Sequence, residues 1–350
     1  MLVADFHFEL PESLIAQEAR PRGTSRLMVV DRARGTWTDA TIAELPSVLA
    51  PGDLMVVNDT RVFPARLLGR RDPSGGAVEC FLLTRRSATE WDTLMSPAQR
   101  LSIGARVVFE HDRAPGIRLH GEIRERGDRG RRVVSFTVEG AASVDAAIDA
   151  LGHVPLPPYI RRPDTADDRA RYQTVYARER GSVAAPTAGL HFDEAGLAAL
   201  AARGVRRAAV TLHVGYGTFK PVKAERVEDH VVDPEPYEIS DETAAAIADT
   251  RAGGGRIVAV GTTTTRALEH AARSGGGVVR PGAAIADIFL YPGHPFAVVD
   301  AMLTNFHLPQ SSLLMLVAGF AGRDLVLDAY RAAVDRGYHF YSYGDAMVVI

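Results

Sequence analysis

Two patterns of hydrophobic and polar residues divide this chain. Between residues 53 and 138, short apolar runs alternate with turn-forming residues, and each run has the length of a single β-strand. The expected strands are Leu54–Val57, Ala77–Leu83, Ala105–Phe109, Ile117–Ile123 and Val133–Val138. Strands this short and this closely spaced predict a small antiparallel barrel or sandwich.

The pattern changes after residue 186, where longer runs of helical character alternate with short apolar runs. The expected helices are Glu194–Arg203, Asp241–Arg251, Arg266–Arg273 and Asp324–Arg336, and the expected strands are Arg207–His213, Ile257–Val260 and Ile285–Leu290. The first fifty residues have the same character, with a strand expected at Leu27–Asp31 and a short helix at Ile42–Leu49. Such alternation predicts a sheet that is flanked by helices.

Together the two patterns predict an α/β protein with an insertion. The larger α/β domain, residues 1–60 and 152–350, has helices around a mixed sheet, and residues 61–151 form an inserted small antiparallel β-barrel domain. Residues 154–168 are rich in Pro and Arg, which favours a linker or a surface loop.

The composition is that of an ordinary globular protein. Of the 350 residues, 46% are hydrophobic and 24% are charged, so the chain can bury a sizeable core. The single cysteine, Cys80, excludes an internal disulfide and a thiolate metal cluster. The first ten residues lack the features of a signal peptide, and no apolar run approaches the ~20 residues that span a membrane. We therefore expect a cytoplasmic protein without a membrane partner.

The charge is unevenly distributed along the chain. The formal net charge is −3, but residues 61–132 contain 15 Arg, no Lys and 9 acidic residues, which leaves +6 there and −9 elsewhere. Such asymmetry is typical of a region that meets a polyanion such as RNA. A solvated arginine-rich surface explains it equally well.

Polar residues beside a buried apolar run mark the first candidate site. Asn305 and His307 stand directly before Pro309 and the apolar run 313–317, which anchors them to the core. Rigidly held Asn and His side chains are what a binding or catalytic site needs. Two further histidines, His191 and His213, also lie near loop Gly or Pro residues, so we expect one site assembled from three segments.

The segment from Ile257 to Arg266 runs from a buried strand into a helix. Gly261 permits a tight turn, the following threonines supply hydroxyl groups, and the helix N-terminus carries partial positive charge. These features favour a carboxylate or a phosphate, and ordinary threonine capping is the alternative. The Gly-Lys-Ser/Thr of a P-loop is missing from the sequence.

Isolated carboxylates and histidines complete the candidates. Asp59 and Arg61 follow an expected strand, where α/β proteins place ligand contacts, although Asp is also a common turn residue. Asp345 lies beside a glycine and before an apolar tail, which either docks it into the core or leaves it in solvent. The histidines are far apart and form no H-E-x-x-H motif, so we expect no metal.

In this order and at these spacings, eight segments resemble the S-adenosylmethionine:tRNA ribosyltransferase-isomerase family of queuosine biosynthesis. They are residues 8–11, 25–27, 53–61, 185–192, 213–222, 261–269, 304–317 and 342–347, so the resemblance covers essentially the whole chain. It implies an α/β domain with an inserted β-barrel. It also implies transfer of the ribosyl moiety of S-adenosylmethionine onto 7-aminomethyl-7-deazaguanine at the tRNA wobble position, giving epoxyqueuosine and releasing adenine and methionine.

The demands of that reaction suggest roles for the candidate residues. A base must abstract a proton next to the sulfonium and adenine must be helped to leave, so we expect His191 and His213 to act as acid and base with Asp345 in support. The expected substrate-binding residues are Asp59, Arg61, Thr187, Gly189, Gly215, Thr218, Thr262, Thr263, Arg266, Asn305 and His307. S-adenosylmethionine would be a co-substrate, no further cofactor is expected, and we expect a monomer.

Five positions depart from the family pattern, namely Thr24, Tyr216, Asp233, Gln310 and His339. Positive charge is usual at 310 and 339, and its loss bears on the acceptor more than on the donor. Two alternatives therefore stay open. One is a paralogue that uses S-adenosylmethionine with a non-tRNA small-molecule acceptor, and the other is a non-catalytic RNA-binding protein.

Overall fold

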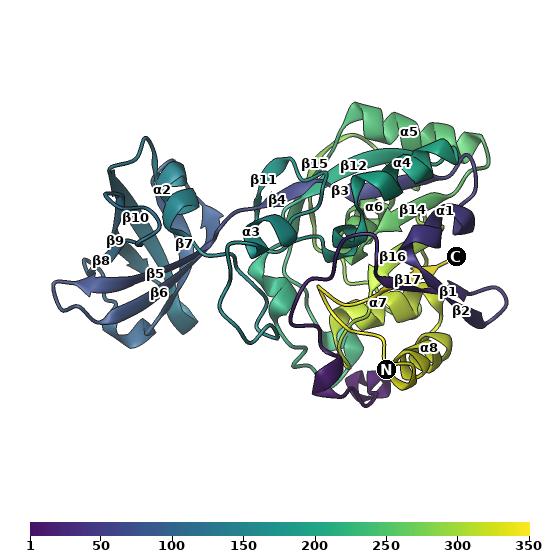
Figure 1. The fold of residues 1–350 in the computed structure, drawn as a ribbon, viewed down its shortest axis with the longest axis horizontal. Coiled ribbons are helices and arrows are strands. Elements are labelled where there is room, and N and C mark those ends of the chain that lie inside the picture. Colours follow the sequence, from purple (N-terminus) through teal and green to yellow (C-terminus); the bar gives the residue numbers. More distant parts are fainter. The chain divides into compact units, whose positions relative to one another are not determined.

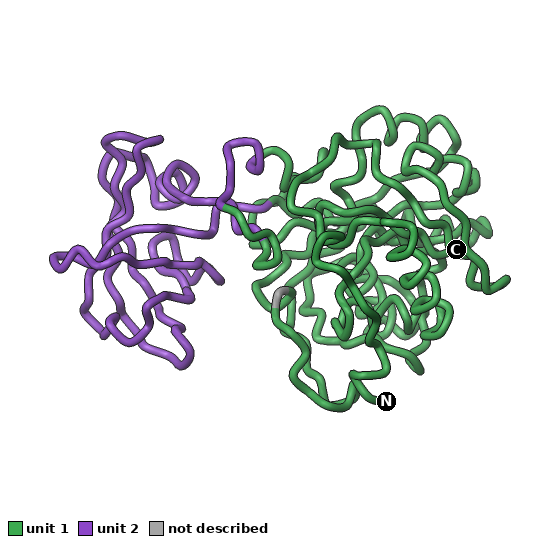
Figure 2. The backbone as a smooth tube through the Cα atoms, turned by 60° about the horizontal axis from the view of Figure 1, so that its bottom comes forward, with its two compact units in different colours: residues 1–61, 157–162, 170–350 green, residues 62–156, 163–169 purple. Residues whose placement is uncertain are grey.

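The computed structural model describes residues 1–350 apart from the side chain of Phe219. The chain divides into two compact units, residues 1–61, 157–162 and 170–350 on the one hand and residues 62–156 and 163–169 on the other (Figure 2). The sequence places these boundaries at 61 and 151, so the smaller unit ends five residues later than expected and also takes in a returning segment.

A nine-stranded mixed sheet forms the centre of the larger unit (Figure 1). In spatial order its strands are β15 (Gly282–Ala286), β13 (Glu235–Ile239), β12 (Arg206–Leu212), β3 (Leu54–Asn58), β14 (Ile257–Val260), β16 (Ala301–Asn305), β17 (Ala346–Val349), β1 (Arg26–Asp31) and β2 (Thr36–Thr41). The four central strands β12, β3, β14 and β16 are parallel, so their carboxyl ends lie at one edge of the sheet.

Alternate residues of the central strands enter two hydrophobic cores, one on each face of the sheet. On β3, Leu54 and Val56 belong to one core, whereas Met55 and Val57 belong to the other. Helices α5 (Asp241–Ala252), α6 (Thr262–Ser274), α7 (Ser312–Ala321) and α8 (Arg323–Asp335) pack into the first core, and α1 (Leu45–Val48) and α4 (Glu194–Ala202) into the second. Because both faces are covered, β14 is apolar throughout and β3 is apolar up to its last residue, Asn58.

The smaller unit is a closed antiparallel barrel. Its strands follow the order β10 (Arg131–Glu139), β7 (Glu90–Ser96), β6 (Ala77–Arg85), β5 (Arg66–Asp72), β8 (Arg106–Phe109) and β9 (Arg118–Arg126). Helix α2 (Val144–Leu151) packs against β9 and β10. The predicted fold class, an α/β domain with an inserted antiparallel barrel, is confirmed.

The remaining regular elements are short. Strand β4 (Thr60–Val62) pairs with β11 (Glu179–Ser182), and α3 covers Asp168–Arg171. Among the described residues, no helix combines the length and the apolar character that crossing a membrane requires.

Several expectations about individual elements were wrong or incomplete. The strand expected at Ile285–Leu290 lies instead at Gly282–Ala286, because pairing with β13 selects the edge strand rather than the more apolar run. Strands β5 and β7 were not predicted, since their exposed faces carry polar residues. Helix α7 was expected only as a buried apolar run, and α6 begins at Thr262 rather than at Arg266.

Candidate active site

A recess lies where the central strands of the larger unit end. The space in it that no atom occupies is about 600 Å³, with open solvent at its mouth included. Asn305 is the last residue of β16, and Gly261 and Val214 follow β14 and β12. The other lining residues are Tyr159, Tyr172, Ala184, Ala185, Pro186, Thr187, Ala188, Thr218, Thr262, Thr263, Thr304, His307, Leu313, Tyr341 and Ser342. This is the edge at which α/β sheets bind ligands.

Asn305 connects three segments around the recess. Its Oδ1 accepts a hydrogen bond from Thr187 Oγ1 at 3.1 Å, and its Nδ2 lies 3.0 Å from His191 Nε2 and 3.1 Å from the Tyr341 carbonyl oxygen. The amide can only donate to His191, so Nε2 of that ring is the acceptor and Nδ1 carries the proton. Nδ1 then donates to Ser25 Oγ at 2.8 Å. Both nitrogens of His191 are therefore occupied within the protein.

Two buried histidines near the recess are held in the neutral state. Burial lowers the pKa of His191 to about 4, although the negative charge of Asp345 opposes the shift. Burial alone lowers the pKa of His307 to about 3. His307 lines the recess, with its Nε2 2.9 Å from Thr304 Oγ1, whereas His191 lies one residue behind the wall, beyond Asn305. Neither ring adds positive charge to the recess at neutral pH.

The N-terminus of α6 opens onto the recess through Thr262 and Thr263. The helix starts after Gly261, whose φ of +93° is a conformation that favours glycine, and no side chain among the described residues caps its first turn. The next two hydroxyls are used internally, because Thr264 Oγ1 bonds the Val260 carbonyl at 2.8 Å and Thr265 Oγ1 bonds the Gly261 carbonyl at 3.1 Å. The uncapped amide groups and the first two threonines form an anion-binding end.

Arg266 does not face this anion-binding end. Its Nη1 forms an ion pair with Glu235 Oε2 at 2.6 Å, and both side chains are nearly buried. Its remaining donors bond backbone carbonyls, including that of Ala286 at 3.1 Å. Glu235 Oε1 in turn accepts the backbone N–H of Gly215 at 3.0 Å. Arg266 and Gly215, both expected to bind substrate, are thus joined in a structural network behind the site.

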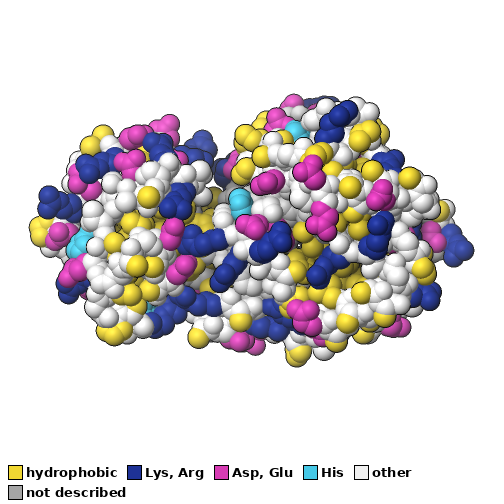
Figure 3. Space-filling view, turned by 90° about the horizontal axis from the view of Figure 1, so that it is seen from above, with side chains coloured by type: hydrophobic (Ala, Val, Ile, Leu, Met, Phe, Trp, Pro, Cys, Tyr) yellow, Lys and Arg dark blue, Asp and Glu magenta, His cyan; other side chains and the backbone are white. Residues whose placement is uncertain are grey.

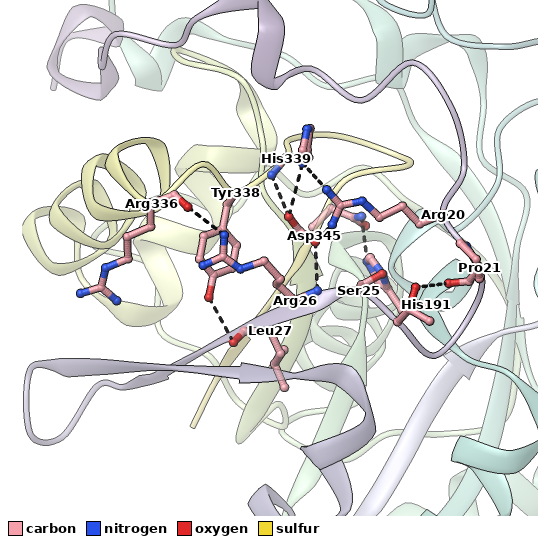
Figure 4. A network of polar contacts seen from close by, with 12 residues as sticks. Arg20, Pro21, Ser25, Arg26, Leu27, His191, Arg336, Tyr338, His339 and Asp345 are labelled. Atoms are coloured by element: carbon pink, nitrogen blue, oxygen red, sulfur yellow. Dashed lines mark hydrogen bonds and ion pairs between the residues drawn. The ribbon is translucent and has the colours of Figure 1, made fainter.

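Asp345 is completely buried and accepts three hydrogen bonds (Figure 4). Its donors are the backbone N–H of Arg26 at 2.9 Å, the backbone N–H of His339 at 2.8 Å, and Arg20 Nη1 at 3.0 Å. Arg20 Nη2 also contacts His339 Nδ1. The carboxylate therefore fixes the guanidinium of Arg20, which lines a smaller recess together with Ser25, His191 and Ser342.

His213 and Asp59 lie in a separate polar cluster. His213 Nδ1 is 2.8 Å from Thr60 Oγ1, and burial lowers the pKa of the ring. Asp59 accepts from Thr211 Oγ1 at 2.7 Å and from Arg178 Nη2 at 2.9 Å. Neither residue lines the larger recess, and Arg61 is exposed at the end of the larger unit. The structure does not bring these three predicted residues into the recess.

Two further predicted residues serve different purposes. Thr218 lines the recess, as the sequence reading expects of a substrate-binding residue. Gly189 is required for packing, because a Cβ atom there would lie 2.1 Å from the hydroxyl oxygen of Tyr176. Among the side chains that the structure describes, no three His, Cys, Asp or Glu residues come together as a metal site would require.

Sequence reasoning missed an aromatic part of the wall. The rings of Tyr159 and Tyr341 contact each other with their centroids 3.8 Å apart and their planes tilted by 33°, and Tyr172 and Ser342 also belong to the lining. Tyr341 has a φ of +74°, which is strained for a residue other than glycine and is found at functional sites more often than elsewhere. No signal in the sequence separates these tyrosines from ordinary core residues.

Comparison with known proteins agrees with the resemblance. Residues 3–349 match the family described as queuosine biosynthesis protein. A protein of Symbiobacterium thermophilum named S-adenosylmethionine:tRNA ribosyltransferase-isomerase is 50% identical over 351 residues, covering 100% of both chains. A protein of the same name from Anaeromyxobacter dehalogenans is 51% identical over 354 residues, covering 100% of this chain and 99% of its own.

A solved structure gives the same result. The crystal structure of S-adenosylmethionine tRNA ribosyltransferase from Thermotoga maritima is 36% identical, covers 99% of this chain and 100% of its own, and superposes with a TM-score of 0.55. The two alternatives, a paralogue with a small-molecule acceptor and a non-catalytic RNA-binding protein, receive no support from these relatives. The chain belongs to the queuosine biosynthesis protein family, together with enzymes named S-adenosylmethionine:tRNA ribosyltransferase-isomerase.

Proposed function

We propose that this chain is an S-adenosylmethionine:tRNA ribosyltransferase-isomerase. It moves the ribosyl moiety of S-adenosylmethionine onto 7-aminomethyl-7-deazaguanine in the wobble position of a tRNA and gives epoxyqueuosine. Adenine and methionine leave. The observation that carries the proposal is the recess at the strand ends, which combines an anion-binding helix N-terminus with neutral imidazole and amide groups.

The donor fits the charge distribution of the recess. S-adenosylmethionine carries a carboxylate and a sulfonium in the same molecule. The uncapped N-terminus of α6, with Thr262 and Thr263, suits the carboxylate. His191 and His307 remain uncharged because burial depresses their pKa values, so they do not repel the sulfonium.

The chemical steps require positioning more than strong acids. A base removes a proton from the 5′ carbon beside the sulfonium, adenine departs with its bonding electrons, and the amine of the acceptor attacks the resulting sugar carbon. The electron pair on the 5′ carbon then forms a bond to that same sugar carbon in place of the ring oxygen, and the released ring oxygen displaces methionine from the 5′ carbon to close the epoxide. Fixed orientation of donor and acceptor makes these steps effectively intramolecular.

Contacts within the protein suggest a division of roles. Asn305, Thr187 and His307 line the recess, so we assign them to substrate contact. His191 holds the Asn305 amide, and Asp345 holds Arg20, so we assign both to positioning. His213 bonds Thr60 outside the lining and takes no part in this proposal. No metal and no further cofactor is required, and we propose a cytoplasmic monomer.

The barrel offers a surface for the tRNA backbone. Several of its arginines are paired, for example Arg66 with Glu79 at 2.8 Å and Arg86 with Asp92 at 2.9 Å. Others are exposed and, among the described residues, form no ion pair, namely Arg100, Arg126, Arg129 and Arg131. Figure 3 shows basic and acidic side chains interspersed on the face drawn there, so a local group of unpaired arginines, rather than an overall field, would contact phosphates.

A product analysis tests the proposed function. The purified protein is incubated with S-adenosylmethionine and tRNA that carries the aminomethyl-deazaguanine, and the tRNA is digested to nucleosides. Mass spectrometry should detect the epoxy-cyclopentanediol adduct on the deazaguanine. Unchanged nucleosides after many enzyme equivalents of donor have been supplied would refute the proposal.

A further inference from the structure

Tyr172 is one of the residues that line the recess, and its hydroxyl group is buried. The side chain is fully buried, and its hydroxyl oxygen makes no hydrogen bond among the described residues. It lies near the backbone of Ala185 and the side chain of Ser342, which both line the recess. Ser342 Oγ is hydrogen-bonded to the hydroxyl of Tyr159, and neither Ser342 nor Ala185 lies in hydrogen-bonding geometry with the Tyr172 hydroxyl, although both lower its pKa.

An unpartnered buried hydroxyl is costly. Leaving such a group without a hydrogen bond costs roughly 1–3 kcal/mol, so it gains free energy when a water molecule or a ligand supplies the missing partner. Burial raises the pKa of Tyr172, which keeps the phenol protonated and therefore able to donate. The hydroxyl is a ready-made donor for a group that enters the recess.

The neighbouring rings indicate what kind of group this is. Tyr159 and Tyr341 contact each other and line the recess together with Tyr172, and their aromatic surface suits a flat heteroaromatic ring. Tyr341 is held rigidly, because its N–H bonds the Phe306 carbonyl at 2.9 Å and its carbonyl accepts from Asn305 and from the Gly344 N–H. A planar ring with a polar edge would be stacked and hydrogen-bonded at the same time.

We infer that Tyr172 hydrogen-bonds the edge of the adenine ring of S-adenosylmethionine and that Tyr159 and Tyr341 form the apolar wall beside it. The inference rests on the proposed function and specifies which residues recognise the base of its donor substrate. The anion-binding end formed by α6 takes the carboxylate, and the tyrosines take the base. A donor on the adenine edge also stabilises the electron pair that the purine receives when its bond to the sugar breaks.

Replacing Tyr172 by Phe removes the hydroxyl and nothing else. We expect Y172F to bind S-adenosylmethionine and adenosine roughly ten-fold more weakly by calorimetry, while its affinity for methionine and its KM for tRNA stay unchanged. The melting temperature of the free protein should not fall, because no hydrogen bond within the protein is lost.

A second tyrosine provides the matched control. The hydroxyl of Tyr176 is also buried and unpartnered among the described residues, but Tyr176 does not line the recess. Y176F should therefore keep both the melting temperature and the ligand affinities of the natural protein. Comparison of the two variants separates loss of a ligand contact from loss of a buried hydroxyl as such.

Three results would overturn the inference. Unchanged affinity of Y172F for S-adenosylmethionine would show that the hydroxyl does not contact the donor. A higher KM for tRNA with unchanged affinity for S-adenosylmethionine would mean that the hydroxyl contacts the acceptor. A melting temperature lowered by several degrees would mean that the hydroxyl has a partner within the protein. A natural protein that binds no S-adenosylmethionine would instead refute the proposed function itself.

Discussion

The side-chain amide of Asn305 donates a hydrogen bond to Nε2 of His191 across 3.0 Å, although the two residues are 114 positions apart in the sequence. The contact joins the end of β16 to the 3₁₀ turn Thr187–His191. It fixes the tautomer of the imidazole and the orientation of the amide together. The lining of the recess therefore depends on a pair of residues of which only Asn305 is part of that lining.

Replacement of Asn305 by Ala should lower turnover by about 10²-fold, because misplacement of the reacting groups by about 1 Å costs that much. The variant loses the bonds to Thr187, to His191 and to the Tyr341 carbonyl at once. Steady-state adenine release measures the effect. Asn58→Ala is the matched control, since Asn58 is buried and bonds the backbone of Leu212 outside the recess. It should lower the melting temperature and spare kcat; an N305A variant within three-fold of the natural rate would contradict the role of Asn305.

The hydroxyls at the start of α6 should contribute to donor affinity. The double variant T262V/T263V should bind S-adenosylmethionine and methionine roughly ten-fold more weakly, because hydrogen bonds to a charged carboxylate are lost. Calorimetric titration measures both affinities. T264V/T265V removes two hydroxyls of the same helix that bond backbone carbonyls, so it should leave methionine affinity unchanged. Equal losses in the two double variants would mean that the effect is structural.

The ion pair between Arg266 and Glu235 should matter for stability rather than for binding. R266M leaves a buried carboxylate without its partner, which costs about 3–5 kcal/mol of unfolding free energy. Urea unfolding measures this loss. R331A provides the control, because the pair of Arg331 with Asp328 is exposed and contributes about 0–1 kcal/mol. If R266M were as stable as the natural protein but no longer bound methionine, Arg266 would be a ligand-binding residue and the prediction would be wrong.

The free energy of unfolding should decrease as the pH is lowered, because His191 must then bury a positive charge in the folded protein. Its pKa is about 4 in the folded protein and about 6.5 in the unfolded chain, so the unfolded state takes up the proton first. The stabilisation is complete above pH 6.5 and is lost as pH falls toward 4, at up to ~1.4 kcal/mol per pH unit. Urea unfolding at several pH values should show a shallower slope for H191Q than for the natural protein. Identical slopes for H191Q and the natural protein would contradict this account of His191.

Much of the fold follows from the sequence because strand burial leaves a regular pattern. Strands such as Leu54–Asn58 are buried on both faces and read as continuous apolar runs. Strand Glu90–Ser96 has one exposed face, so its acidic and hydroxyl residues conceal it. Strand Gly282–Ala286 is an edge strand with mostly exposed residues, and only its pairing with β13 reveals it.

The candidate site was less predictable because the sequence does not show which partner a polar side chain will contact in the folded protein. Asn305 and Thr187 were expected at the site and do line the recess. Arg266 was also expected at the site, yet its guanidinium is paired with Glu235, 31 positions earlier in the chain. Tyr172 was overlooked because a buried tyrosine looks like part of the core until its hydroxyl proves to have no partner.

Adenine release from S-adenosylmethionine, followed by chromatography, tests the central claim most directly. Three reactions are compared: with tRNA carrying the aminomethyl-deazaguanine, with the same tRNA carrying guanine, and with the free deazapurine alone. We expect adenine only in the first reaction, in equal amount to modified tRNA. Adenine formed with the free deazapurine alone, or tight tRNA binding without any adenine, would contradict the account.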